Sequence, residues 1–221
     1  MHDILLIGDS LTEWNYENGW GQKMKEWYTD KANVINCGYG GYTSQKIKEN
    51  IQWITYAHSF PMICTILLGT NDCYFHGICI SPQVYKQNIV HVIQHIRSLH
   101  NYTVILLITP PVCGLNKSIL YYVTKTREIA REQCVPLVDL HKPGPFQITL
   151  DDLYDGTHIN EKGNKKLFEN IKHTLLTHFS IVCPDALKLD KRKDVDDIVH
   201  VDDIVHVDDI VHVDDDVDID S

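Results

Sequence analysis

Short apolar runs alternate with longer amphipathic stretches through the first 180 residues of the chain. The runs are brief and rich in Ile, Val and Leu, which is typical of strands buried on both faces of a parallel sheet. We predict five such strands, at Asp3–Gly8, Val34–Gly38, Met62–Leu68, Thr103–Thr109 and Pro136–Asp139.

The stretches that separate these runs have the length and spacing of helices, at Trp20–Tyr28, Ser44–Ile54, Pro82–Leu99, Ile119–Gln133 and Glu161–Phe179. In the third, Ser81 suits the N-cap and Pro82 the first turn. Tyr85, Ile89 and Val92 then recur at helical spacing. Repeated strand–helix steps predict an α/β, flavodoxin-like three-layer fold around a five-stranded parallel sheet, in which ligands bind beyond the carboxyl ends of the strands.

The C-terminal end of the chain is different in kind. Val-Asp-Asp-Ile-Val-His occurs three times without interruption from Val195 to His212. A six-residue period fits neither a helix nor an alternating strand, so no consistent face can be buried, and the Asp charges repel one another. We predict one folded α/β domain at 1–182, a linker at 183–193 and a disordered acidic tail at 194–221. A metal-binding or partner-binding tail is the alternative.

The net charge of −10 over 221 residues belongs to this tail. Residues 194–221 carry 12 Asp and no Lys or Arg, and the other 193 residues have 20 basic and 18 acidic side chains, a net charge of +2. A near-neutral body predicts neither a nucleic-acid nor an acidic-membrane partner. The sequence leaves the oligomeric state open.

Seven cysteines occur without a C-x-x-C pair, which argues against both a disulfide framework and a zinc ribbon. No apolar run approaches the roughly 20 residues of a membrane span. The N-terminus has neither a basic leader nor an apolar region of signal-peptide length, so we expect a cytoplasmic protein.

Several polar residues are suited to nucleophilic catalysis. Ser10 comes directly after the first strand, in Gly8-Asp9-Ser10-Leu11. A serine needs a base and an orienting acid to act as a nucleophile. Asp155 and His158 supply both, because Gly156 can bend the chain so that the carboxylate reaches one imidazole nitrogen while the other faces Ser10. The combination predicts a catalytic triad in which Ser10, His158 and Asp155 are joined in a hydrogen-bonded row.

Two further segments predict an oxyanion site. Asn71 follows the third strand, in Gly69-Thr70-Asn71-Asp72, and its amide can donate to a developing oxyanion. Glycines follow the second strand, in Gly38-Tyr39-Gly40-Gly41-Tyr42, where a backbone N–H can approach a substrate closely. Asp72 is expected to hold the Asn71 loop, and Asp9 to orient the turn, rather than to react.

Together these segments resemble the four blocks of the SGNH (GDSL-type) hydrolases, with Ser10, Gly41, Asn71 and His158 as the block residues and Asp155 as the family's acid. The resemblance is closer still to the isoamyl acetate-hydrolysing esterases. It extends over roughly residues 3–180 and is carried by Gly8–Glu13, Gly19–Gly21, Gly41–Ser44, Leu68–Asp72, Thr109–Pro111, Asp155–His158 and Lys162–Asn164.

The resemblance implies a serine esterase that hydrolyses short-chain esters, with acetyl esters of small alcohols as substrates and no metal or organic cofactor. It also implies an oxyanion hole made by Ser10 N–H, Gly41 N–H and Asn71. Carbohydrate acetyl groups, lysophospholipids and thioesters are alternative substrates. A catalytically silent binding module is the alternative from another class.

Other residues near the blocks support weaker predictions. Trp14, Tyr16 and Trp20 follow Ser10 closely and are candidates for the walls of a substrate pocket, although aromatic residues at such positions are as often part of a core. His91 and His95 lie four residues apart on a predicted helix and could clamp a metal, but an exposed polar helix face explains the pair more simply.

Overall fold

The computed structural model describes residues 2–14, 18–58, 60–73, 79–114 and 117–187. Five strands form a single parallel sheet in the order β2-β1-β3-β4-β5. They are β1 (His2–Gly8), β2 (Ala32–Gly38), β3 (Pro61–Leu67), β4 (Val104–Ile108) and β5 (Leu137–Val138). This order is the flavodoxin-like one, so the predicted five-stranded α/β fold is confirmed.

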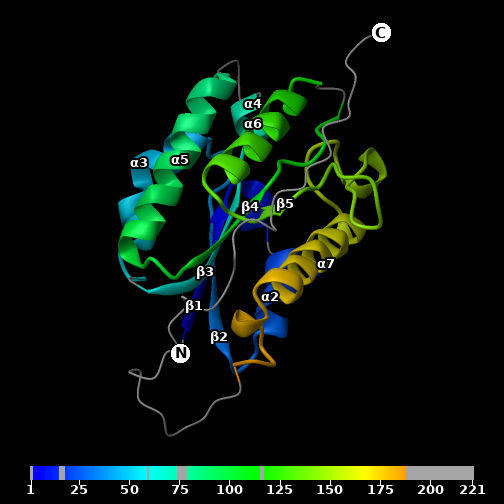
Figure 1. Cartoon of the computed structure of the whole chain (residues 1–221). Coiled ribbons are helices and arrows are strands. Elements are labelled where there is room, and N and C mark those ends of the chain that lie inside the picture. The colour runs from blue at the N-terminus through cyan, green and yellow to red at the C-terminus, as the bar shows by residue number, and fades with distance from the viewer. Residues whose placement is uncertain (1, 15–17, 59, 74–78, 115–116, 188–221) are drawn as a thin grey trace, which may run out of the picture. The chain divides into compact units, whose positions relative to one another are not determined.

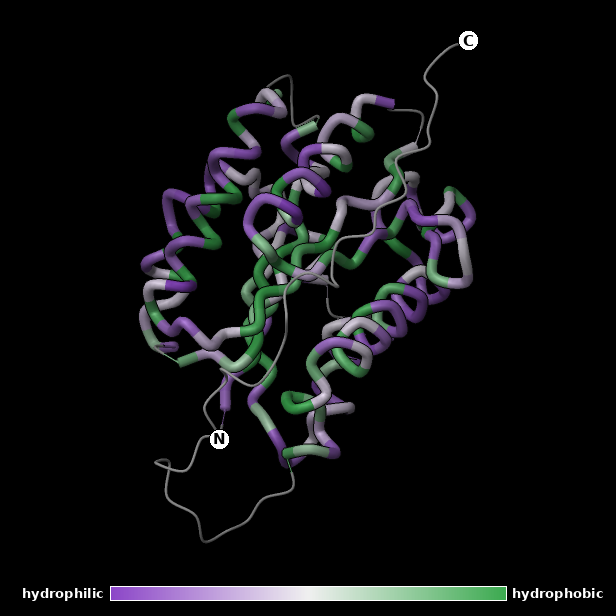
Figure 2. Tube along the Cα trace, viewed as in Figure 1, coloured by the Kyte–Doolittle hydropathy of each residue, from purple (hydrophilic) through white to green (hydrophobic). Residues whose placement is uncertain are grey.

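Helices cover both faces of the sheet, as Figure 1 shows. On one face lie α3 (Ser44–Thr55), α5 (Pro82–Leu99) and α6 (Ile119–Glu132), and on the other lie α2 (Trp20–Trp27) and α7 (Glu161–His178). In Figure 2 the apolar colour concentrates on the sheet while the outer faces of the helices are largely polar. The five helices that the apolar periodicity predicts are therefore all present.

The interior strand β1, which pairs with β2 on one side and β3 on the other, shows why the core has two halves. Successive side chains of a strand point to opposite faces, and all four central residues of β1 are almost completely buried. Leu5 and Ile7 pack with the helices of one layer, whereas Ile4 and Leu6 pack with those of the other. Burial of each such side chain contributes about 1.5–3 kcal/mol relative to exposure. The apolar run of β1 thus joins the two layers.

Four short helical segments accompany these elements. Two of them, α1 (Ser10–Glu13) and α4 (Thr70–Cys73), begin within two or three residues of the carboxyl ends of β1 and β3. The other two are 3₁₀ turns, η1 (Leu150–Asp152) before α7 and η2 (Ser180–Val182) after it. The sequence pattern predicted none of the four. The two α-turns matter most, because each carries a predicted site residue.

The ordered body continues past the predicted end of the domain at residue 182. Cys183 is 2% exposed and lies in the core cluster beneath α2 and α7. The hydroxyl of Tyr28 donates to the carbonyl of Val182 at 3.0 Å, and Leu187 packs against the same core. The first five residues of the predicted linker 183–193 are therefore part of the folded body, which is a correction. The predicted acidic tail, 194–221, lies outside the described residues.

Two properties of the body bear on its chemistry. None of the seven cysteines, all of which lie in the described residues, forms a disulfide bond. Among the helices of the described residues, none is both long enough and apolar enough to cross a membrane.

Candidate active site

The structure brings Ser10, His158 and Asp155 into one hydrogen-bonded row. Ser10 Oγ lies 3.0 Å from His158 Nε2, and His158 Nδ1 lies 2.7 Å from Asp155 Oδ2. Ser10 is the first residue of α1, whereas the other two belong to the loop that precedes α7. With Nδ1–H donating to the carboxylate, Nε2 is left as the acceptor that faces the serine hydroxyl. The row has the order expected for an activated serine.

The loop that carries Asp155 and His158 is shaped around the carboxylate. Gly156 has φ of +84°, a conformation that favours glycine. Asp155 Oδ1 accepts the backbone N–H groups of Thr157 and His158 at 3.0 and 2.8 Å. Partial burial raises the pKa of Asp155, but these bonds and the bond to the imidazole outweigh it and lower the pKa to about 2. The acid is therefore ionised at neutral pH.

The predicted oxyanion donors come from loops that follow three adjacent strands. Gly41, after β2, has φ of +72°, which a side chain would strain. Asn71, in α4 after β3, donates its amide Nδ2 to the carbonyl of Tyr42 at 3.0 Å, so the two loops are tied together. Within the described residues the backbone N–H groups of Ser10 and Gly41 have no hydrogen-bond partner. Three donors are thus available beyond the ends of the strands.

Two buried acids, Asp72 and Asp9, fix the segments that carry Asn71 and Ser10. Asp72 accepts the backbone N–H of Ser44 and its hydroxyl, which fixes α4 against the start of α3. Burial raises the pKa of Asp72 to about 6 despite those bonds. Asp9 caps α1 by accepting the N–H of Leu11 at 2.9 Å. Its other carboxylate oxygen is buried without a partner, and burial raises the pKa of Asp9 to about 7.

The three aromatic residues that are candidates for the walls of a substrate pocket differ in their positions in the structure. Trp14, at the end of α1, stacks on the His158 ring with centroids 3.8 Å apart and an interplanar angle of 18°. Trp20 is 1% exposed and donates its indole N–H to the carbonyl of Leu11. It packs in the core, so the prediction of a pocket wall is wrong for Trp20, because α2 turns this side chain toward the sheet. Tyr16 lies outside the described residues.

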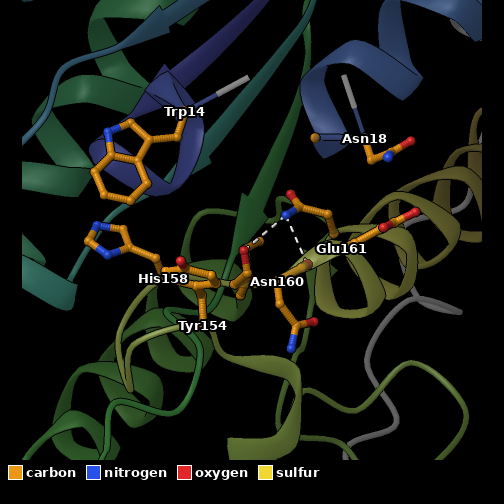
Figure 3. Close-up of a pocket in the computed structure, with 9 residues that line it drawn as sticks. Trp14, Asn18, Tyr154, His158, Asn160 and Glu161 are labelled. Atoms are coloured by element: carbon orange, nitrogen blue, oxygen red, sulfur yellow. Dashed lines mark hydrogen bonds between the residues drawn. The ribbon is translucent and has the colours of Figure 1, made fainter. Parts of the chain in front are cut away.

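A pocket of about 630 Å³ opens beside the stacked Trp14 and His158 rings (Figure 3). In this view Trp14 and His158 lie together on the left, and Asn18 and Glu161 lie opposite them on the right, with Glu161 below Asn18. Tyr154 extends below His158 from the same loop. Of these five residues, only Trp14 and His158 were predicted from the sequence, since nothing local marks the other three as site residues.

The histidine pair on α5 has an ordinary structural setting. His95 Nε2 lies 2.8 Å from Thr55 Oγ1, while His91 is exposed. In the part of the chain that the structure describes, no group of three or more His, Cys, Asp or Glu side chains is arranged to hold a metal ion.

Known proteins share both the sequence pattern and the fold. A GDSL esterase/lipase of Arabidopsis thaliana is 26% identical over 78% of this chain and 85% of its own length. The isoamyl acetate-hydrolyzing esterase 1 homologue of Mus musculus is 26% identical over 76% of this chain and 79% of its own length. The resemblance to that branch is therefore confirmed.

Among solved structures, the acetyl xylan esterase AlAXEase has a TM-score of 0.70 at 21% identity, covering 78% of this chain and 99% of its own. TesA has a TM-score of 0.65 at 22% identity, covering 79% of this chain and 98% of its own. At these identities the two structures show the fold alone. The model of the GDSL-like Lipase/Acylhydrolase family matches residues 6–166, which span most of the chain and hold Ser10, Gly41, Asn71, Asp155 and His158. The chain therefore belongs to the GDSL-like lipase/acylhydrolase family.

Proposed function

We propose that the protein is a serine esterase that hydrolyses short-chain carboxylic esters through an acyl-enzyme on Ser10. The main observation in support of this proposal is the 3.0 Å distance between Ser10 Oγ and His158 Nε2. As the hydroxyl attacks the ester carbon, His158 takes its proton. The carbon–alkoxide bond then breaks, and the same proton passes to the departing alcohol.

In the second half of the reaction, water replaces the alcohol. His158 removes a proton from the water, the hydroxide attacks the acyl carbon, and the proton returns to Ser10 as the acid leaves. Asp155 keeps the imidazole in the tautomer with a free Nε2 and stabilises the cation that forms twice. The short 2.7 Å contact and the low pKa of Asp155 suit this role.

Each attack creates a negatively charged oxygen, which the backbone N–H groups of Ser10 and Gly41 and the amide of Asn71 would bind. Such donors act best when they are held in place before the charge appears. The bond from Asn71 to the Tyr42 carbonyl and the anchoring of Asp72 to Ser44 support that rigidity. The positive φ of Gly41 further supports Gly41 as the donor from the loop that follows β2.

The resemblance to the isoamyl acetate-hydrolysing branch favours an acetyl or similarly short acyl group. Carbohydrate acetyl groups are the second candidate, supported by the size of the pocket beside His158, about 630 Å³. Lysophospholipids and thioesters are further candidates within the family. A binding module without catalysis is disfavoured by the complete hydrogen-bonded row.

Labelling with a fluorophosphonate tests the mechanism. We expect wild-type protein to be labelled at Ser10 and to hydrolyse p-nitrophenyl acetate, and Ser10→Ala to lose both properties. Ser98→Ala is the matched control, because Ser98 is an exposed serine on α5. Wild-type turnover by the Ser10→Ala protein would overturn the acyl-enzyme mechanism. Absence of both labelling and turnover in the wild type would favour the binding module.

A further inference from the structure

Helix α4, which carries Asn71, is too short to hold its own position. It has four residues, whereas an isolated helix is only marginally stable even at about 12–15 residues. Its orientation therefore depends on contacts with neighbouring elements. If Asn71 donates to the oxyanion, those contacts also determine how well the charge is bound, because such donors act best when they are held in place in advance. The inference drawn from them rests on the proposed function.

The side chain of Asp72 ties α4 to the first residue of α3. Asp72 is 0% exposed, and its carboxylate accepts the hydroxyl of Ser44 and also the backbone N–H of Ser44, at 2.9 Å. Asn71 itself donates to the carbonyl of Tyr42, two residues before Ser44. The segment that carries Asn71 is therefore tied at two points to the segment that follows β2.

Asn88, on α5, extends this contact into a chain of three buried side chains. Asn88 Nδ2 lies 3.1 Å from Ser44 Oγ, and the two residues are 1% and 0% exposed. Burial raises the pKa of Asp72 only to about 6, so at pH 8 the carboxylate is ionised and can only accept. Ser44 therefore gives its single hydroxyl hydrogen to Asp72, and its oxygen accepts the amide N–H of Asn88. The direction of every hydrogen bond in the Asn88–Ser44–Asp72 chain is thus fixed.

A second polar contact joins the same two helices, which lie side by side in Figure 1. Thr55, the last residue of α3, is 2% exposed, and its hydroxyl lies 2.8 Å from His95 Nε2 on α5. This hydroxyl donates to the carbonyl of Ile51 in its own helix. At about 1.5 Å per residue, Thr55 lies roughly 17 Å along α3 from Ser44. Of the two contacts, the one at Ser44 continues to Asp72.

Helix α6 gives α4 a separate support. The hydroxyl of Tyr122 lies 3.0 Å from the carbonyl oxygen of Asp72 and 2.6 Å from that of Ile80. The backbone N–H of Ile80 donates to the same Asp72 carbonyl at 3.1 Å. These contacts remain when the side chain of Ser44 or Asn88 is shortened. Such a change should therefore loosen the Asn71 amide without unfolding α4.

We propose that Ser44 and Asn88 are positioning residues for the oxyanion site, which fix the Asn71 amide through the carboxylate of Asp72. Both side chains are buried, so they act through Asn71 and not on the substrate. The oxyanion exists only in the transition state and the tetrahedral intermediate. Loss of either side chain should therefore lower kcat rather than raise KM.

Steady-state kinetics of the full chain on p-nitrophenyl acetate at pH 8 test the proposal. We expect Ser44→Ala to lower kcat about tenfold with little change in KM, a part of the 10²–10³ that loss of an oxyanion donor costs. Asn88→Ala should act in the same direction to a smaller extent. Because it retains both bonds between Ser44 and Asp72, it tests the chain independently of the stability of Ser44→Ala. Thr55→Ala, which removes a buried hydroxyl from the other end of α3, is the matched control and should leave kcat unchanged.

A double-mutant cycle separates positioning from a general loss of structure. If Ser44 acts through Asn71, Ser44→Ala should cause no further loss of kcat in Asn71→Ala protein, because the donor that it positions is already absent. An additive loss in the double variant would overturn the proposal. An equal loss of kcat in Thr55→Ala, or wild-type kcat in both Ser44→Ala and Asn88→Ala, would overturn it as well.

A structural measurement distinguishes this proposal from the esterase mechanism on which it rests. In NMR spectra of isotope-labelled protein, the side-chain amide signals of Asn71 should shift or broaden in Ser44→Ala and Asn88→Ala, and stay in place in Thr55→Ala. These changes in a protein whose wild type does not hydrolyse the ester would overturn the mechanism and leave the anchoring of Asn71 standing. Unchanged Asn71 signals alongside an active wild type would overturn the positioning role alone.

Discussion

In the proposed mechanism, the single amide of Asn71 has two purposes. One N–H donates to the Tyr42 carbonyl, and the other would donate to the oxyanion. We expect Asn71→Ala to lower kcat by about 10²–10³ with little change in KM, because the lost bond strengthens in the transition state. Steady-state kinetics on p-nitrophenyl acetate measure both constants. Asn50→Ala removes an exposed amide on α3 and is the control. A raised KM at unchanged kcat would assign Asn71 to ground-state binding instead.

Asp9 makes stability depend on pH in a direction opposite to that of most carboxylates. Burial raises the pKa of Asp9 from 3.8 to about 7. Between these two pH values Asp9 is therefore protonated in the folded state and ionised in the unfolded state. Its contribution is therefore fully present below about pH 4 and is lost as pH rises through about 7, a change of about 4 kcal/mol at most. Asp72, with its pKa raised to about 6, acts in the same direction.

Urea unfolding of wild-type protein and of Asp9→Asn at pH 5 and pH 8 measures this effect. The wild type should be less stable at pH 8 than at pH 5. Asn at position 9 resembles the protonated acid, so the variant should lose most of this difference and keep the part that belongs to Asp72. Equal pH dependence in the two proteins would mean that Asp9 ionises in the folded state as readily as in the unfolded chain.

Helix α1 packs so closely on the end of β2 that one position there admits only glycine. A Cβ atom at Gly38 would lie 2.2 Å from the backbone nitrogen of Glu13, whereas one at Gly40 would meet only the Glu13 carboxylate, at 2.6 Å. The backbone of Glu13 cannot move aside to relieve such a contact, but the flexible end of the Glu13 side chain can. We expect Gly38→Ala to destabilise the protein by about 1–3 kcal/mol and to lower kcat by displacing Ser10.

Gly40→Ala is the matched variant from the same loop and should stay close to wild type. Thermal unfolding and p-nitrophenyl acetate turnover measure both effects. Similar losses in the two variants would show that the loop after β2, rather than its contact with α1, is the sensitive feature.

Periodicity in the sequence was sufficient for the long elements and insufficient for the short ones. An apolar stripe such as Tyr85, Ile89 and Val92 on α5 repeats over several turns, so it identifies both the helix and its buried face. Helices α1 and α4 have four residues each, too few for a stripe. Helix α1 is instead marked by a local cap, in which the Asp9 side chain accepts the N–H of Leu11. Trp20 was misassigned because burial of a single aromatic depends on tertiary packing.

The candidate site likewise has residues that could be predicted from the sequence and contacts that could not. Ser10, Asn71 and His158 could be predicted because each directly follows a recognisable strand or stands in a short motif with its partner. The link from Asn71 to Tyr42 spans 29 residues and joins two loops, which no local pattern reports. Tyr154 and Glu161 reach the pocket only because η1 and the start of α7 turn the chain beside Trp14.

Every element and every residue of the candidate site in the described structure lies between residues 2 and 187. Deletion of residues 194–221 should therefore leave folding and kcat/KM nearly unchanged, while net charge moves from −10 to +2 and the isoelectric point rises. Thermal unfolding, isoelectric focusing and kinetics on full-length and shortened protein measure this. The competing hypothesis is that the Asp- and His-containing repeat binds divalent cations. A fall of several degrees in Tm, or tail-dependent binding of Ca²⁺ or Zn²⁺ tighter than micromolar, would favour it.

Ser10 and His158 lie 148 positions apart in the sequence, which has a consequence for biosynthesis. Ser10 is translated well before His158, its base in the proposed mechanism. At the roughly 5–20 residues per second of protein synthesis, each nascent chain carries an unactivated serine for on the order of ten seconds. In the proposed mechanism, incomplete products would stay inert toward esters until α7 docks on the sheet. Esterase turnover would then report completed folding, and we expect two fragments divided between β4 and α6 to generate signal only on reassembly.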